Sequence, residues 1–184
     1  MKATLPSGAL VPLDNCYIKI PIFDNITIPM NILPDISDSK GASYPDESAI
    51  GRSMPFKQFQ NSDNRAISWT CHFMVCQKGD QETILRYLKI FEACVYPLTS
   101  DQYTGGAPYA PPPICKLRCG ALLSAVEADD LCVVMKNYSV KFDTSVPWDE
   151  ETYVPYKLDV DLQFEVVYNQ ANLPGAEKIM SDGV

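Results

Sequence analysis

Cysteine is the residue type in this sequence with the widest chemistry, since a thiol can form a disulfide, bind a metal or act as a nucleophile. The chain has 184 residues and seven cysteines, an odd number, so at least one thiol stays free or bonds to another chain. Six are candidates for disulfides formed within the chain or between subunits after the protein leaves a reducing cytoplasm: Cys16, Cys71, Cys76, Cys115, Cys119 and Cys132. The alternative is that most cysteines are small buried apolar side chains, as free cysteines usually are.

Metal binding and histidine-based catalysis are not expected. The spacings from Cys71 to Cys76 and from Cys115 to Cys119 differ from the two-residue knuckles of structural zinc sites. The only histidine, His72, follows Cys71 on a predicted strand, where neighbouring side chains point to opposite faces, so a Cys–His catalytic pair is not expected there. The sequence also lacks a glycine-rich phosphate loop and a nucleophile elbow. We therefore expect a protein that is not an enzyme and holds no cofactor or metal.

Two kinds of catalysis stay open as alternatives. A cysteine-dependent enzyme or redox protein would need a thiol in positive surroundings, and Cys115 and Cys119 beside Lys116 and Arg118 are the best candidates. Catalysis by carboxylates alone also stays open, because a sequence does not show which acidic residues meet in space.

The charge balance of the sequence restricts which kinds of molecule the protein is expected to bind. Fifteen basic residues against 23 acidic ones give a net charge of -8, which argues against binding nucleic acid by phosphate neutralisation. It does not argue against a surface past which nucleic acid slides. No apolar run approaches the roughly 20 residues that cross a bilayer, and the first residues lack the pattern of a secretory signal, so we expect no membrane insertion and no cleaved leader.

The cysteines, His72 and the charged residues considered so far must be positioned mainly by strands. Residues 66–75 and 157–166 alternate between apolar and polar side chains, as half-buried strands do. Between them, residues 114–123 and 131–142 predict a hairpin, and on the second of these strands one face is expected to carry Cys132, Val134, Lys136, Tyr138, Val140 and Phe142. One amphipathic helix is expected near residues 81–96, with Asp80 as N-cap and Pro97 as its stop. The fold class is mainly β (α+β): an antiparallel β-sandwich or half-barrel with one flanking helix.

The chain is expected to divide into three parts. Residues 1–60 carry seven of the 15 prolines and predict an N-terminal arm with short strands near 16–20 and 26–28. Residues 61–168 would form the β domain, and residues 169–184 a C-terminal extension. An arm of this kind either packs on its own domain or lies across a neighbouring subunit.

An ordered series of short motifs resembles a known family. Residues 51–56 (GRSMPF) and 62–70 (SDNRAISWT) are followed by 95–97 (VYP), 113–117 (PICKL), 138–140 (YSV), 146–148 (VPW) and 155–160 (PYKLDV). In this order they resemble the tail-tube initiator and related baseplate proteins of contractile-tailed bacteriophages, over residues 45 to 168.

The resemblance implies a tail-tube-like fold that assembles as a ring of six copies in the virion, after synthesis in the host cytoplasm. The ring would join the baseplate hub to the tail tube, with sheath or wedge proteins as further partners, and DNA would pass through it without specific binding. A sister role stays open: a clamp or tie protein that fastens the hub, the sheath initiator and the wedge.

Within such a ring, two sets of residues are candidates for function. The interface candidates are Gly51, Arg52, Pro55, Arg65, Tyr103, Tyr109 and Trp148. In this set the arginines could form bidentate pairs with carboxylates of a neighbour, and the tyrosines could anchor an interface. The candidates for facing the lumen are Asp159, Asp161 and Glu165, which would repel phosphate; alternatively they are an ordinary solvated strand face.

Overall fold

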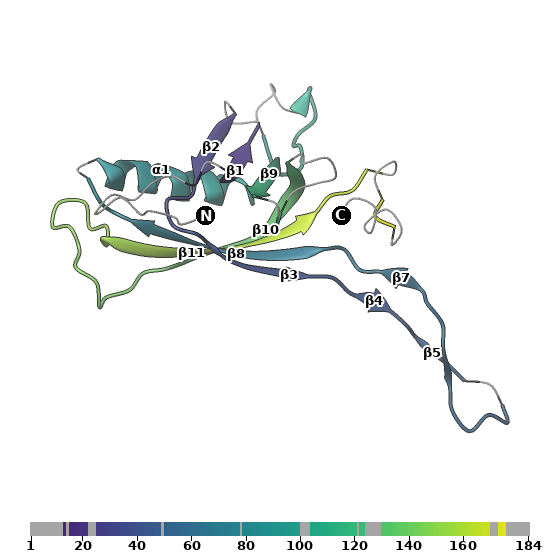
Figure 1. Ribbon diagram of the computed structural model, residues 1–184. Helices are drawn as coiled ribbons and strands as arrows, with labels where there is room; N and C mark the ends of the chain where they lie inside the picture. The colour runs from purple at the N-terminus through teal and green to yellow at the C-terminus, as the bar shows by residue number, and fades with distance from the viewer. Residues whose placement is uncertain are drawn as a thin grey trace.

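One long antiparallel sheet organises the chain. The computed structural model describes residues 13, 15–21, 25–48, 50–77, 79–99, 104–120, 122–123, 130–169 and 173–175. Within these residues, seven strands form a sheet in the order β2-β1-β9-β10-β11-β8-β3, and two short two-stranded sheets, β4-β7 and β5-β6, stand apart from it (Figure 1). The strands are β1 (Cys16–Ile20), β2 (Ile26–Pro29), β3 (Asp35–Ser39), β4 (Ala42–Ser43), β5 (Asp46–Glu47), β6 (Phe56–Lys57), β7 (Asn61–Ser62), β8 (Ala66–Met74), β9 (Ile114–Cys119), β10 (Leu131–Lys141) and β11 (Lys157–Val166).

The sheet curves around its single described helix, α1 (Asp80–Ala93). Helix α1 lies on one face of β8 and β11, and β1, β2 and β9 rise on the same side (Figure 1). The predicted fold class is confirmed: the protein is mainly β, with an antiparallel sheet and one flanking helix. No helix in the described ranges is long and apolar enough to cross a membrane.

The central pair, β8 and β11, follows the predicted alternation. Apart from Ala66 and Met74 at the two ends of β8, the apolar residues of both strands point toward α1. Those buried at the centre are Ile67, Trp69, Cys71, Leu158, Val160, Leu162 and Phe164. The two strands pair antiparallel over nine successive positions, from Lys157 opposite Met74 to Glu165 opposite Ala66. Since side chains alternate along a strand, this register puts one apolar face under the helix and one polar face on the other side.

Strand β10 departs from the predicted pattern. A β-bulge between Met135 and Asn137 lets Lys136 stand outside the regular pairing with β11. The bulge shifts the alternation along β10. Before the bulge the core-facing residues are Leu131, Val133 and Met135, which are buried. After it they are Tyr138 and Val140, which are half-buried. The single face predicted from Cys132 to Phe142 was therefore wrong. The bulge brings the Tyr138 ring to 6.5 Å from that of Phe91 on α1.

Helix α1 begins and ends earlier than predicted. Its N-cap is Gly79, whose φ of 104° lies in the left-handed region that glycine tolerates. Asp80, predicted as the cap, instead accepts hydrogen bonds from the backbone N–H groups of Cys76 and Gln77, 2.9 and 2.8 Å away. The helix ends at Ala93, before Pro97. The backbone N–H of Cys94 donates to the carbonyls of both Ile90 and Phe91, which tightens the last turn of the helix.

The N-terminal strands belong to the main sheet. Strand β1 pairs with both β2 and β9, and its side chains at Cys16, Ile18 and Ile20 are buried in the same core as those of β11. Strand β3 pairs with β8. Of the two placements left open for the N-terminal segment, β1, β2 and β3 therefore pair within the chain's own sheet.

The aromatic contact between helix and sheet generates a first test. Phe91 is fully buried, with ring centroids 6.4 Å from Phe73 on β8 and 6.5 Å from Tyr138 on β10. Phe91→Ala should lower the free energy of unfolding by about 3–5 kcal/mol in urea denaturation, because it leaves a cavity under the helix. Leu85→Ala, on the same helix at 37% exposure, is the control and should cost less than about 1 kcal/mol. Equal losses for the two variants would contradict this packing.

Candidate assembly surfaces

A two-stranded ribbon projects from the sheet. Strands β3 and β8 continue as β4 paired with β7 and then β5 paired with β6, and this ribbon points away from the body of the molecule (Figure 1). We call residues 40–64 the ribbon arm. At about 3.3–3.6 Å per fully extended residue, the ten steps from residue 40 to residue 50 span at most about 35 Å.

The ribbon arm exposes large apolar side chains. Ile50 at the tip is fully exposed and Met54 is 77% exposed. Further along, Tyr44, Phe56 and Phe59 are also exposed, and the rings of Tyr44 and Phe59 meet edge to face with centroids 5.6 Å apart. A two-stranded ribbon has no core of its own and is marginal in water when isolated. Apolar residues in such a place are typical of a surface that is covered by another molecule.

Three of the predicted interface residues gather at the arm's tip. Gly51 has φ of 89°, a conformation that side chains other than glycine rarely adopt, so it sets the turn. The Arg52 guanidinium lies over the Phe56 ring, with Cζ 5.2 Å from the centroid, and Pro55 is exposed beside it. The tip therefore offers a cation and exposed apolar side chains within a few residues.

The other predicted interface residues lie elsewhere. Tyr109 is exposed in the loop before β9, and Tyr103 lies outside the described residues. Trp148 is on the β10–β11 loop, where its ring packs on Phe142 at 6.3 Å and its indole N–H donates to the Asp143 carbonyl at 3.2 Å. The predicted set is thus spread over three regions.

Arg65 is engaged within its own chain. Its Nε and Nη2 donate to the two carboxylate oxygens of Asp38 at 2.9 and 2.8 Å, a bidentate pair that joins the end of β3 to the start of β8. The predicted bidentate pairing with a neighbour's carboxylate is therefore replaced by a contact at the base of the ribbon arm. Burial would raise the pKa of Asp38, but the hydrogen bonds and charge of Arg65, helped by Lys40, lower it overall.

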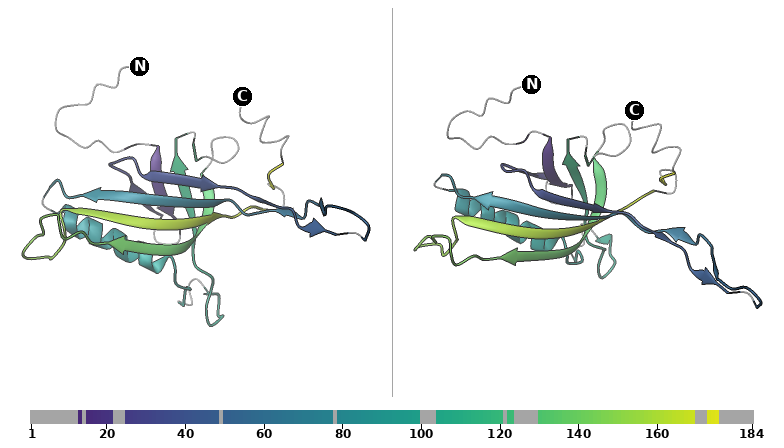
Figure 2. Two further views of the ribbon diagram at one scale, coloured as in Figure 1. Left: turned by 90° about the horizontal axis from the view of Figure 1, so that it is seen from below. Right: turned by 60° about the horizontal axis from the view of Figure 1, so that its bottom comes forward.

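The second surface is the face of the sheet opposite α1, which we call the open face. Figure 2 (left) views it with β3, β8, β11 and β10 in front of the helix. Asp159, Asp161 and Glu165 of β11 all lie on it, as the alternation predicts. The residues around them on β3, β8 and β10 are mainly small and polar: Ser37, Ser68, Thr70, Asn137 and Ser139.

We call Asp159, Asp161 and Glu165 the acidic row, and each of these carboxylates has a partner on a neighbouring segment. Thr70 Oγ1 donates to Asp161 at 2.6 Å. Lys136 Nζ lies 2.6 Å from Glu165, and Asn64 Nδ2 donates to the same carboxylate at 2.5 Å, which lowers the pKa of Glu165. The carboxylates of the acidic row are therefore hydrogen-bonded or ion-paired to neighbouring side chains. Lys136 holds its place there because the β10 bulge releases it from the regular pairing.

His72 links three strands on the open face. Its Nδ1 lies 2.7 Å from Asp159 on β11, and its Nε2 lies 3.3 Å from Asp35 on β3. An imidazole between two carboxylates ties these neighbouring strands together by side chains as well as by backbone. The sequence pointed to His72 only as a side chain on the face opposite Cys71; the Asp35 contact is not visible from local spacing.

All seven cysteines lie within the described residues and all are free thiols. Five are buried, Cys132 is half-buried and Cys76 is exposed. None of the six predicted disulfide candidates is bonded in this structure. Cys115 and Cys119 point into the core, whereas Lys116 and Arg118 point to the opposite face, so the positive surroundings expected for a reactive thiol are not formed.

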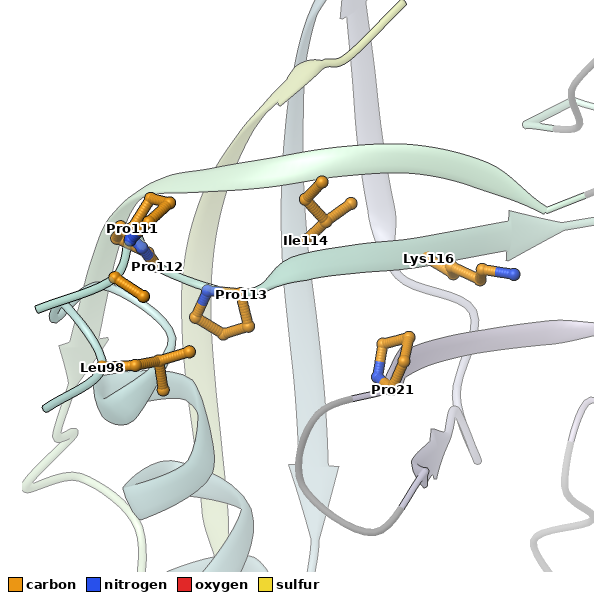
Figure 3. A pocket seen from close by; sticks show the side chains of 8 residues that line it. Pro21, Leu98, Pro111, Pro112, Pro113, Ile114 and Lys116 are labelled. Atoms are coloured by element: carbon orange, nitrogen blue, oxygen red, sulfur yellow. The ribbon is translucent and has the colours of Figure 1, made fainter. Parts of the chain in front are cut away.

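A shallow groove of about 420 Å³ lies where β1 ends and β9 begins. Figure 3 shows Pro21, Leu98, the run Pro111–Pro113 and Ile114 around it, with Lys116 at its edge. Among the described residues that line the groove, Lys116 is the only ionisable one, so these residues supply no acid–base pair. Within the described part of the chain, no three His, Cys, Asp or Glu side chains are close enough to hold a metal ion.

No protein-family model matches the chain, and no curated protein matches it.

The base of the ribbon arm gives a pH-dependent prediction. Asp38→Asn should lower the free energy of unfolding by about 1 kcal/mol at pH 7. Because the pKa of Asp38 is lower in the folded state than the unfolded value of about 3.9, its pair with Arg65 stabilises at higher pH and is lost as the pH falls through the folded pKa. Denaturation curves should therefore show the difference between wild type and variant shrinking below about pH 4.

The matched control is Asp46→Asn, since Asp46 pairs with Lys57 farther out on the ribbon arm and both side chains are more than half exposed. That variant should cost less than about 0.5 kcal/mol at any pH. Equal effects of the two variants, or a constant difference from pH 7 to 2, would show that the Asp38 pair does not hold the arm.

Proposed function

We propose that this protein is a structural subunit of a ring assembly, of the tail-tube initiator type found in baseplates of contractile phage tails. The observation that carries the proposal is the ribbon arm, because it projects from the sheet and presents Ile50 and Met54 to solvent. Specific interfaces commonly bury more than about 1,000 Å² in total, and an arm of this length laid on a neighbour contributes much of that area.

The open face supports the same proposal. A channel that conducts DNA must not hold the polyanion, and this face combines ionised carboxylates with small hydroxyl and amide side chains. Three lysines lie on or beside this face: Lys136 Nζ is 2.6 Å from Glu165, Lys157 Nζ is 3.9 Å from Asp159, and Lys141 is the register partner of Asp159. In the proposed ring this face lines the channel.

The cysteine-dependent enzyme is less well supported. Its best candidates, Cys115 and Cys119, are almost fully buried, and a nucleophile must reach its substrate. The clamp or tie role stays closer to the observations, since an exposed arm would serve it too. The two structural roles differ in where the protein lies: in the ring at the base of the tube, or around the hub.

The test is assembly with the partners that the proposal names. The chain should be monomeric or weakly associated alone, and should form rings when co-expressed with the tube and hub proteins of its own particle, as seen by electron microscopy. Density around the hub without a ring would favour the clamp role. Absence of the chain from assembled particles would overturn the structural proposal.

The ribbon arm should be required for this assembly. Met54→Asp places a charge where the proposal buries an apolar side chain, which should weaken incorporation at least tenfold, or by about 1.4 kcal/mol or more. Leu122→Asp is the matched control, because Leu122 is 78% exposed against 77% for Met54 and lies outside the arm. Both variants should keep the melting temperature of the wild type. Equal incorporation of the two variants would contradict the role of the arm.

A further inference from the structure

Two buried thiols face each other across the β1–β9 pair. Cys16 and Cys119 are direct register partners, and their sulfur atoms are 3.6 Å apart. The Gly120 N–H donates to the Asn15 carbonyl at 2.7 Å, so the hydrogen bonds flank the cysteines and the Cys16–Cys119 position is a non-hydrogen-bonded pair. Opposite residues of that kind have Cα atoms about 4.5 Å apart, within the range of about 4.4–6.8 Å that a disulfide spans.

We propose that Cys16 and Cys119 form a disulfide when the protein meets a disulfide oxidant such as oxidised glutathione. The sulfur atoms need to approach by about 1.5 Å to reach the bonding distance of about 2.05 Å, a movement that side-chain rotation supplies. The product is a covalent link between β1 and β9, which we call the staple, and it fits the two strands as they are paired in the sheet.

The other thiols are less suited to this reaction. Cys115 lies four residues from Cys119 on the same strand, about 13 Å away, which excludes a bond between them. Cys94 and Cys115 contact each other between helix and sheet, but both are fully buried, as is Cys71. Cys16 and Cys119 keep a small exposure, and Cys16 lies on β1, one strand from the edge of the sheet, where local opening is easiest.

The reaction balances as two thiol–disulfide exchanges. One cysteine loses its proton and its thiolate attacks a sulfur of oxidised glutathione, forming a mixed disulfide and releasing a glutathione thiolate. The second cysteine, deprotonated in turn, attacks the protein sulfur of that mixed disulfide and releases the other glutathione thiolate. Two electrons pass to glutathione, and the protons end on its two thiols.

The folded state slows this chemistry. Burial, together with the hydrogen bond to Cys119 and its charge, raises the pKa of Cys16 to about 12, so its thiolate is scarce at neutral pH. Oxidation should therefore depend on opening of the β1–β2 edge and should accelerate as the pH rises. A reducing cytoplasm would leave the thiols intact, and an oxidising exterior would close the staple.

The staple has a defined structural consequence. In the described sheet, β2 pairs only with β1, so the hairpin of β1 and β2 is held to the other strands through β1–β9 pairing. A bond between residues 103 apart in sequence closes a long loop, which restricts the unfolded chain strongly. The oxidised protein should melt roughly 5–15 °C higher than the reduced one.

The experiment is oxidation of the full chain by glutathione disulfide, followed by thiol blocking, proteolysis and mass spectrometry. The expected result is a linked pair of peptides containing Cys16 and Cys119, with the higher melting temperature appearing at the same rate. Exposed Cys76 should carry glutathione in the same sample, which confirms that the oxidant is active.

Variants keep the proposal testable. Cys119→Ser should lose both the link and the melting shift, and Cys132→Ser, at a half-buried cysteine outside the pair, should keep both. Should Cys119→Ser fail to fold, peptide mapping of the wild type alone decides the matter. Unlinked Cys16 and Cys119 after Cys76 is fully modified, or a link from either one to a different cysteine, would overturn the proposal.

Discussion

The pairing of β8 with β11 divides the molecule into two chemically different sides. Nine residues stay in register, and strict alternation sends Trp69, Val160 and Leu162 under α1 while Asp159 and Asp161 face the other way. The helix, the β10 bulge that supplies Tyr138 and the polar open face all depend on that register, because a slip of one residue would exchange the two faces. The same pair also carries β3 on its outer side, and so supports the ribbon arm.

The ribbon arm exposes apolar side chains to water, whereas the open face exposes polar ones. The arm presents Met54 and Phe59 to solvent, where apolar residues are favourable only when something covers them. The open face keeps its carboxylates satisfied by Thr70, His72 and Lys136, and so needs no partner. One side suited to docking and another suited to water support the proposal of an assembly around an aqueous channel.

The parts of the fold that depend on local patterns could be predicted from the sequence. The alternation of apolar and polar residues predicted β8 and β11, and the apolar stripe that includes Leu88 and Phe91 predicted α1. Features that depend on distant pairing could not be predicted. The bulge at Lys136 divides the expected face of β10 between the two sides of the sheet, and Arg65 pairs with Asp38, 27 positions away in the sequence. Of the candidate site, the acidic row followed from alternation, whereas the apolar tip of the arm did not, because single apolar residues among prolines give no periodic signal.

The central claim is that the ribbon arm is completed by another molecule. Hydrogen exchange of the backbone amides in residues 42–62 tests it most directly, compared between the free chain and the assembled particle, with β8 and β11 as the protected reference. The account predicts fast exchange of the arm in the free chain and strong protection after assembly. An arm that is already as protected as β11 in the monomer, or that exchanges equally fast in the particle, would contradict it.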